Sequence, residues 1–528
     1  MNTIAALATL ALGFLTGLTA CGGDDPADDP VTPSTGVTVT LRSQSISEGA
    51  EVDAASTTTL DLTYSVMVKV ASSANITLNG SAVTATVNAH DVTSIQIPLA
   101  LSEGTNYTIT IPAGSIVASS DATASAPAFT LNFKTKAAPQ AVNNDATALA
   151  RRLGWGWNLG NHFDTSSSKD GEPMSYTENG KVIKYWDKAT PAAQLYTNLK
   201  QAGASTVRIG VTWGNYQTAD PWTIDAAYMA EVKQNVDWAE AAGLNVILNM
   251  HHDEYWLNIK DASTNNIIND QIKDRIAKTW TQIAATFKDK GDFLFFETFN
   301  EVQDGQWGWG TNRTDGGKQY RTLNEWNQTA VDAIRATGGN NATRWIGVPG
   351  YASSPTFVVA DDFTLPSDPA NRIMVSVHFY DPSNFTLTPE GTYGKSEWGH
   401  TAAVGKFEEG SNEDFVTRTF TSLYNKFVVN NIPVYIGEYG CVMHTNDRSN
   451  LFRNYYLEYV CRAAHTYGMP LCIWDNNSVG GGDEHHGYFN HNDGTYLNNM
   501  QQLVQTMIQA ATSNDASYTL LTVYNKAP

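Results

Sequence analysis

Residues 293–303 read Phe-Leu-Phe-Phe-Glu-Thr-Phe-Asn-Glu-Val-Gln and carry the strongest fold signal in the chain. The run is apolar on both faces until Glu297, as in a strand buried on both sides of a parallel sheet, and it leads into Asn300 and Glu301. In α/β barrels the loops that follow the strands line the open end, where catalytic residues are placed. Taken alone, Glu301 could instead begin a solvated loop.

A second carboxylate favours the catalytic interpretation. Residues 432–439 read Ile-Pro-Val-Tyr-Ile-Gly-Glu-Tyr, another short β-branched run, and this run also ends at a glutamate, Glu438. Two glutamates at strand ends that face one cleft are the pair that glycoside hydrolysis requires.

Short apolar runs alternate with segments of helical period from residue 146 to residue 513. The helical pattern is clearest in residues 228–242 and 272–287. This order predicts an α/β fold, a (β/α)8 TIM barrel with long loops. An open doubly wound sheet is the alternative, but no glycine-rich phosphate loop follows any run. The eight expected strands are 153–160, 206–213, 244–250, 293–299, 345–348, 373–380, 434–437 and 470–474.

A different composition precedes the barrel. Residues 37–136 are rich in Thr, Ser, Ala and Val with period-two alternation, which predicts a small all-β sandwich. The stretch from residue 101 to residue 114 resembles bacterial Ig-like domains. Because all 14 Trp lie from Trp155 onward, a sugar-binding module is the weaker alternative, and we expect a spacer. The expected boundaries are 1–21 for a signal peptide, 22–36 for an acidic flexible tether, 37–136 for the sandwich, 137–145 for a linker, 146–513 for the barrel and 514–528 for a C-terminal tail.

The N-terminus predicts export. Residues 4–18 form an apolar run too short for a membrane span, and the run ends in Leu-Thr-Ala-Cys at Cys21. This ending resembles a bacterial lipoprotein signal, which implies cleavage before Cys21 and acylation of its thiol, although no basic residue precedes the apolar run. An ordinary secretory signal is the alternative. We therefore expect a protein anchored by lipid at the outer membrane surface, or a secreted one.

Charge and cysteine content restrict the partners. The formal net charge of −20 argues against nucleic acid or an anionic membrane surface and favours a neutral substrate. Beyond Cys21, three cysteines without C-x-x-C spacing argue against a disulfide framework and a zinc site and leave at most one disulfide bridge. We expect them to be small core residues: Cys441, Cys461 and Cys472. The chain is expected to be a monomer.

Polar and aromatic residues gather at the ends of seven of the eight expected strands. Any one of them could be structural, because a buried Arg or His is usually a satisfied hydrogen-bonding residue. As an ordered set they resemble the motifs of glycoside hydrolase family five, over roughly residues 150 to 510. The family implies a (β/α)8 barrel and a retaining mechanism. The motifs are Gly-Trp-Asn-Leu-Gly-Asn at 156–161, Val-Arg-Ile at 207–209, Asn-Met-His-His at 249–252, Phe-Asn-Glu at 299–301, His-Phe-Tyr at 378–380, Ile-Gly-Glu at 436–438 and Ile-Trp at 473–474.

The resemblance assigns roles position by position. Glu301 becomes the general acid/base, with its pKa raised by the ionised Glu438, and Glu438 becomes the nucleophile. Arg208 and Tyr380 hold the nucleophile ionised. Asn300 would bond the sugar 2-OH, and His378 would orient Glu301. The subsite for the reacting ring would be lined by His251, His252 and Trp474. Asn161 and Asp164 would bind sugar hydroxyls further along the substrate.

Other features are open to two interpretations. Trp307, Trp309 and Trp398 are either outer sugar platforms or buried loop anchors, whereas Trp238, Trp280 and Trp326 fall on helical segments and are expected in the core. Residues 251–253 and 483–486 could be mistaken for metal clusters, but the mechanism implied by the family needs no metal or other cofactor. The Gly-, Asp- and His-rich stretch 480–494 predicts either a mobile loop or a fortuitous calcium site.

The leading functional hypothesis is an endo-acting β-1,4-glucanase on cellulose-like glucan, mixed-linkage glucan or xyloglucan. A β-1,4-mannanase on the same barrel is the enzymatic alternative. A surface glycan-binding lipoprotein on a degenerate barrel is the alternative from another class, and the presence of Glu301, Glu438 and Arg208 argues against it.

Overall fold

The computed structural model describes residues 37–54, 57–89, 91–136, 144–167, 175–178, 181–389, 391, 393–480 and 482–528. The expected signal peptide, Cys21 and the acidic tether lie outside the described residues, as does most of the expected linker. Within the described part of the chain, no helix combines the length and the apolar character that a membrane crossing needs.

The N-terminal region is all β, as its alternating pattern predicts. Its strands form sheets in the orders β1-β3-β8-β7, β10-β4 and β2-β11-β9-β5-β6. Tyr64, Tyr107 and Phe133 are buried in the core of this region, which is consistent with a spacer. The strands are β1 Leu41–Gln44, β2 Glu51–Val52, β3 Thr59–Tyr64, β4 Val68–Val70, β5 Thr77–Leu78, β6 Ser81–Ala82, β7 Thr86–Val87, β8 Ser94–Pro98, β9 Asn106–Ile111, β10 Ile116–Ala118 and β11 Phe129–Thr135.

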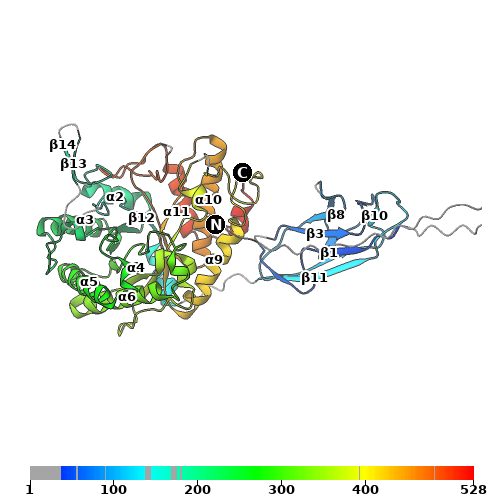
Figure 1. Ribbon diagram of the computed structural model, residues 1–528. Coiled ribbons are helices and arrows are strands. Elements are labelled where there is room, and N and C mark those ends of the chain that lie inside the picture. The colour runs from blue at the N-terminus through cyan, green and yellow to red at the C-terminus, as the bar shows by residue number, and fades with distance from the viewer. Residues whose placement is uncertain are drawn as a thin grey trace, which may run out of the picture. The chain divides into compact units, whose positions relative to one another are not determined.

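The second region is a closed barrel of eight parallel strands, so the predicted fold class is confirmed (Figure 1). The barrel closes where the first strand pairs with the last, with Gly156 opposite Cys472. Each strand lies at one of the eight predicted apolar runs. They are β12 Trp155–Asn158, β15 Thr206–Ile209, β16 Asn245–Asn249, β17 Leu294–Glu297, β18 Ile346–Pro349, β19 Ile373–Phe379, β20 Val434–Tyr439 and β21 Leu471–Ile473.

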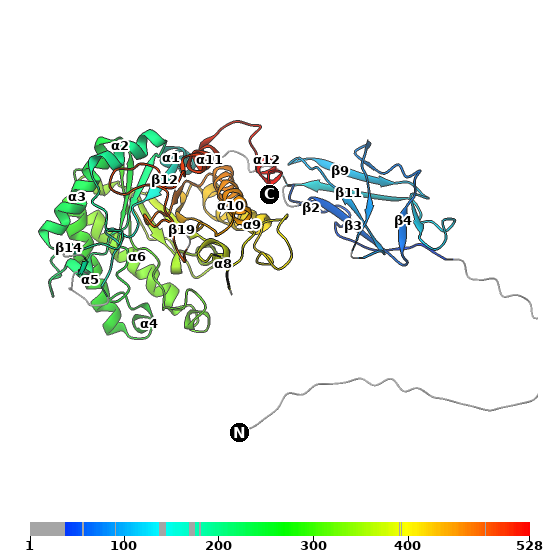
Figure 2. The same cartoon turned by 90° about the horizontal axis from the view of Figure 1, so that it is seen from above.

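Helices surround these strands (Figure 2). They are α1 Asp145–Leu153, α2 Ala193–Ala202, α3 Ala226–Ala241, α4 Ile259–Ala262, α5 Asn266–Phe287, α6 Lys318–Ala336, α7 Pro355–Val358, α8 Ser383–Thr386, α9 Glu413–Lys426, α10 Asp447–Thr466, α11 Gln501–Thr512 and α12 Leu520–Tyr524. A short pair, β13 Tyr176–Glu178 and β14 Lys181–Ile183, lies in the loop after β12, and short 3-10 helices are η1 Gly214–Tyr216, η2 Thr311–Arg313, η3 Gly339–Ala342, η4 Tyr351–Ser353 and η5 Val428–Asn430.

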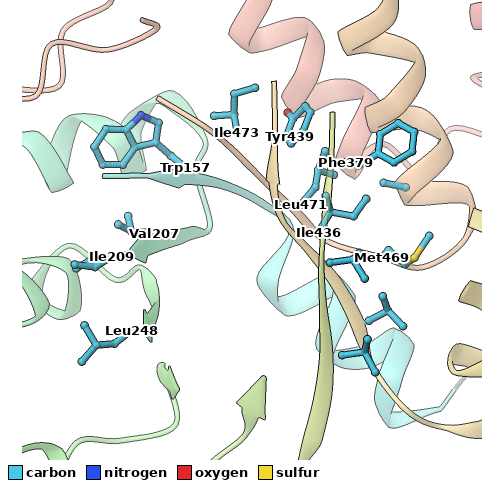
Figure 3. Close-up of a cluster of buried hydrophobic side chains, with 14 of the residues drawn as sticks. Trp157, Val207, Ile209, Leu248, Phe379, Ile436, Tyr439, Met469, Leu471 and Ile473 are labelled. Carbon is cyan, nitrogen blue, oxygen red and sulfur yellow. The ribbon is translucent and has the colours of Figure 1, made fainter. Parts of the chain in front are cut away.

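The alternation of side chains along the strands divides the barrel into an outer and an inner core. One set of strand residues packs with the helices in the large outer cluster, of which Figure 3 shows a part that includes Val207, Leu248 and Ile436. The intervening residues form a separate apolar cluster inside the barrel. It consists of Ile247, Phe295, Met374, Tyr435 and Cys472 from the strands, together with Leu149 and Leu153 from α1.

Two glycines make room inside this inner cluster. A Cβ at Gly156 would lie 2.4 Å from the sulfur of Cys472, and a Cβ at Gly347 would lie 2.3 Å from the Tyr435 hydroxyl. Farther along the same strands the inward side chains become polar. The apolar inner cluster is therefore the base on which the polar site rests.

The C-terminal segment corrects one expectation. Residues 514–528 were expected to be a tail, but they contain α12, and Leu520 and Val523 are buried in the outer core of the barrel. Tyr518 and Lys526 both contact the carboxylate of Glu458 on α10, at 2.6 Å and 2.5 Å. The segment therefore belongs to the barrel. The polar residues 513–519 have no helical period and separate α12 from α11, so the sequence alone suggests a tail after residue 513.

Candidate active site

Glu301 and Glu438 face each other at the end of the barrel reached by the carboxyl ends of the strands. A carboxylate oxygen of each, together with a ring nitrogen of His378, lies within 4.8 Å of the others. Retaining glycosidases place the two carboxyl groups about 5–5.5 Å apart, whereas inverting enzymes need about 6.5–9.5 Å to admit a water. The separation fits direct attack by one carboxylate.

Arg208 on β15 is the centre of the polar layer beneath these glutamates. Its side chain is fully buried, and its guanidinium donates to Glu438 Oε1 at 2.7 Å and to Asn300 Oδ1 at 2.7 Å. It also donates to Asn158 Oδ1 at 3.0 Å and to Glu297 Oε2 at 2.8 Å. Burial lowers the pKa of Arg208, but Glu297 and Glu438 outweigh burial and raise it above its usual value. The guanidinium stays charged and fixes the orientation of Glu438.

Both oxygens of Glu438 have a donor. Arg208 holds Oε1, and the hydroxyl of Tyr380 donates to Oε2 at 3.0 Å. Hydrogen bonds to the charged form favour ionisation, which a nucleophilic carboxylate needs. The structure thus brings Arg208 and Tyr380 to the positions expected from the sequence.

Glu301 lies against His378, with 2.6 Å between its Oε1 and the Nδ1 of the imidazole. Burial raises the pKa of Glu301 to about 7, with Glu254 and Glu484 adding to the shift and His252 and Arg208 opposing it. The sequence predicts that Glu438 raises this pKa, but desolvation is instead the main cause. A carboxyl group with this pKa can donate a proton near neutral pH.

Asn300 has one free hydrogen-bonding group aimed at the site. Its oxygen accepts from Arg208, while its amide nitrogen Nδ2 is buried and has no partner among the described residues. A buried unsatisfied donor is costly unless a ligand completes it. The amide is therefore placed to donate to a substrate hydroxyl.

Comparison with known proteins agrees with this geometry. The cellulase family, glycosyl hydrolase family 5, matches residues 167–480. The chain belongs to glycosyl hydrolase family 5. It is 32% identical over 355 residues to endoglucanase A of Paenibacillus barcinonensis, which covers 63% of this chain and 83% of that protein.

Two other family 5 proteins extend the comparison. A xyloglucan-specific endo-β-1,4-glucanase of Bacteroides ovatus is 34% identical over 329 residues, 61% of this chain and 62% of that protein. The structure of a broad-specificity endoglucanase from Bacteroides salanitronis is 45% identical with a TM-score of 0.65, and the match covers 70% of this chain and 96% of that one. As a member of this family the chain is a glycoside hydrolase of the endoglucanase type.

In this family 5 barrel, His251, His252 and Trp474 lie together beside the two glutamates. The rings of His251 and Trp474 are stacked with centroids 5.9 Å apart, and His251 Nε2 is 3.9 Å from Glu438 Oε1. Burial, His252 and Arg208 keep the pKa of His251 well below its usual value, so this imidazole is neutral. Gly160 allows Trp474 its position, because a Cβ there would lie 2.8 Å from the indole.

The carboxylate of Asp164 lies against the two histidines that follow β16, with an oxygen within 4.8 Å of a ring nitrogen of His251 and of His252. The side chain is fully buried, and Oδ2 accepts from the backbone amide of Asn161 at 2.9 Å. Asn161 itself is partly exposed and has a positive φ of 59°. Its other oxygen, Oδ1, is buried without a partner among the described residues, so direct sugar binding by Asp164 stays a prediction. Asp164 also fixes the turn that presents Asn161.

A buried chain of four charged or titratable side chains was missed by the sequence analysis. His162 contacts Asp187 at 2.9 Å, Asp187 contacts His491 at 2.8 Å, and His491 reaches Asp475 at 3.3 Å. Asp475 also accepts from the indole of Trp157 at 2.8 Å and from the amides of residues 488 and 489. Burial lowers the pKa of His491, but Asp475 and Asp187 outweigh burial and raise it to about 9.

This chain, the His162–Asp475 relay, joins the loop after β12 to the loop after β21. Within the stretch 480–494, Tyr488, Phe489 and His491 are buried, whereas Asp483 and Glu484 are exposed, so the mobile loop and the calcium site stay predictions. Asp475 directly follows Trp474 in sequence, so the relay fixes the strand end that carries the indole. No local pattern signals it, since two members that are in direct contact, Asp187 and His491, lie 304 residues apart.

The tryptophans in the strand-end loops divide into two groups. Trp307 and Trp309, which follow Glu301 in sequence, are 57% and 76% exposed and are available as sugar platforms. Trp398 is only 1% exposed and packs against Tyr455, Tyr456 and Tyr459 of α10, so the platform interpretation is wrong for this residue. Trp280 and Trp326 are buried and Trp238 packs against the core, as expected.

Three cysteines of the barrel are buried and form no disulfide within the described part of the chain, as expected for small core residues: Cys441, Cys461 and Cys472.

Proposed function

We propose that this chain is a retaining endo-β-1,4-glucanase acting by double displacement. The separation of Glu301 and Glu438 carries the proposal, because it leaves no room for a water between nucleophile and anomeric carbon. The family 5 relatives named as endoglucanases and as a xyloglucan-specific glucanase support a β-1,4-glucan backbone as substrate.

In the first step Glu438 attacks the anomeric carbon while Glu301 gives its proton to the leaving glycosidic oxygen. In the second step Glu301, now ionised, takes a proton from water, and the oxygen of that water displaces Glu438 from the same carbon. The Nδ2 group of Asn300 donates to the 2-OH, where a bond strengthens as the oxocarbenium-like transition state forms. Trp474 supplies an apolar face for the sugar ring.

A substrate panel tests this function. We expect reducing ends to be released from carboxymethylcellulose, mixed-linkage glucan or xyloglucan, with a rapid fall in viscosity that shows internal cleavage. The β-anomer of the product, seen first by NMR, would establish retention. Activity on glucomannan alone would make the enzyme a mannanase. Binding of polysaccharide without turnover would make it a glycan-binding protein.

We also propose that Cys21 carries a lipid anchor, and that the N-terminal all-β region is an Ig-like spacer between the anchor and the barrel. The Leu-Thr-Ala-Cys ending and the acidic residues that follow support the anchor. The buried aromatic residues of the all-β region support the spacer.

Replacing Cys21 by Ser is expected to move the protein from the membrane fraction to the soluble fraction. The kcat/KM on soluble glucan should stay unchanged, because both catalytic glutamates belong to the barrel. Fractionation of cells followed by an activity assay measures both quantities. A C461S variant is the matched control, since Cys461 is a buried free thiol of α10. Membrane retention of C21S would contradict the anchor.

A further inference from the structure

Glu297 is a buried carboxylate that the double-displacement mechanism leaves without a task. It is the last residue of β17, four positions before Glu301 in sequence, and its side chain is fully buried. Four donors converge on it. They are Arg208 Nε at 2.8 Å and Asn249 Nδ2 at 2.9 Å on Oε2, and Ser376 Oγ at 2.5 Å and Tyr435 Oη at 2.6 Å on Oε1.

This environment keeps Glu297 ionised. Burial raises the pKa of Glu297, but Arg208 and the hydroxyls of Ser376 and Tyr435 outweigh burial and lower it below its usual value. Removing a carboxylate from water costs several kcal/mol, and only close pairing and hydrogen bonds offset that cost. The negative charge of Glu297 therefore acts on Arg208 and, through Arg208, on Glu438.

Arg208 links the two carboxylates, because it pairs with both Glu297 and Glu438. Its Nε donates to Glu297 and its Nη1 donates to Glu438, so one cation faces two anions, and the side chains of Arg208 and Glu297 are fully buried. Each anion weakens the hold of the guanidinium on the other. The ionisation of the nucleophile therefore depends on a carboxylate that never touches the substrate.

We propose that Glu297 is a positioning residue that both anchors Arg208 and limits how strongly Arg208 stabilises the charge on Glu438. A carboxylate held too strongly as an anion is a poor nucleophile, since nucleophilicity falls with basicity. The second carboxylate holds the guanidinium in place and competes for its charge, so that Glu438 remains a reactive nucleophile. This inference rests on the proposed function, in which Glu438 is the nucleophile.

Glu438 and Glu297 are surrounded by different sets of charged and titratable groups. Glu438 is faced by Arg208 from β15, by His251 after β16, by Glu301 after β17, and by His378 and Tyr380 at the end of β19. Glu297 is faced by Arg208, Tyr435 and His378. Burial lowers the pKa of His378 to about 4 and leaves it neutral, so Arg208 is the cation common to both carboxylates.

A Glu297→Gln variant tests the charge without removing the hydrogen bonds. The amide oxygen can accept from Arg208 and Asn249, and the amide nitrogen can donate to the hydroxyl oxygens of Ser376 and Tyr435, since hydroxyls also accept. Because residue 297 is then neutral, Glu438 is the one carboxylate with which the Arg208 cation pairs. We expect the acid limb of the pH profile to move down by roughly one pH unit, with a several-fold lower plateau.

The measurement is the rate of covalent labelling by a 2-deoxy-2-fluoro-β-cellobioside with a dinitrophenolate leaving group, followed against pH by intact-protein mass. The reagent transfers its sugar to the carboxylate of Glu438 and expels dinitrophenolate, which needs no proton from Glu301. The acid limb therefore reports the ionisation of Glu438. Absence of labelling at Glu438 in the wild type would refute the proposed function, and the inference would fall with it.

A second variant gives the opposite sign. Tyr435→Phe removes a donor from Glu297 but leaves its charge, so Glu297 draws more on Arg208 and the acid limb should move up. Tyr439→Phe is the matched control on the same strand, because its hydroxyl bonds Trp155 and Cys461 outside the network. A labelled wild type with unmoved acid limbs in folded E297Q or Y435F would overturn the inference, as would an upward shift in E297Q.

Discussion

Replacement of Glu301 or Glu438 by Gln is expected to reduce kcat/KM on glucan by at least about 10³-fold, because each loss removes an obligatory step. Without Glu438 no glycosyl-enzyme forms, and without Glu301 the leaving oxygen receives no proton. Reducing-sugar release measures the loss. E325Q, on the exposed carboxylate of Glu325 on α6, is the matched control and should keep wild-type activity.

The pH profile separates the two roles. Because burial raises the pKa of Glu301 to about 7, the acid form is lost as the pH rises through that value, and activity on glucan should fall there. An aryl cellobioside with a dinitrophenolate leaving group needs no proton in the first step, so this basic limb should be absent from its kcat/KM.

Azide rescue assigns the roles by stereochemistry. Azide added to Glu301→Ala should restore turnover and give a glycosyl azide of retained configuration, since azide then attacks the glycosyl-enzyme. Azide added to Glu438→Ala should give the inverted product, since azide then attacks the substrate directly. The reverse pattern would exchange the two assignments.

Arg208→Met is expected to have the second-largest effect. The substitution removes the cation that contacts Glu438 and Glu297, so protonation of Glu438 becomes easier and the acid limb moves to higher pH. Activity should fall across the range and most strongly at low pH. Two buried carboxylates are left without a cation, and we expect a loss of roughly 3–5 kcal/mol in the free energy of unfolding.

Arg208→Lys keeps the charge and tests the geometry. An ammonium cannot reproduce four contacts made in one plane by the guanidinium, so rescue should be partial. The kcat/KM against pH, with unfolding by denaturant as the fold control, measures both variants. A folded Met variant with an unmoved acid limb would reduce Arg208 to a structural strand residue.

The fold was predictable because parallel strands in a barrel are buried on both faces. Such strands read as unbroken apolar runs, and β17 and β20 are the clearest examples. The main site residues were predictable for a related reason. Polar residues at the carboxyl end of an apolar strand are unusual, so Glu301, which follows β17, and Arg208, which lies near the end of β15, could be singled out.

Groups held by distant partners could not be predicted in this way. Glu297 was visible in the sequence as a charge within an apolar run, but its partners lie on four other strands. The relay from His162 to Asp475 has no local pattern at all. Trp398 and Trp307 both lie in loops, and only tertiary packing buries one and exposes the other.

The His162–Asp475 relay has a consequence for the order in which the protein becomes active. Trp157 leaves the ribosome 318 residues before its partner Asp475. Until the last strand docks, β12 has one open edge, and the carboxylates of Asp187 and Asp475 lack the imidazole of His491 between them. The indole floor of Trp474 is thus assembled at the end of folding. A nascent chain of this enzyme acquires its cleft only when its C-terminal part is complete.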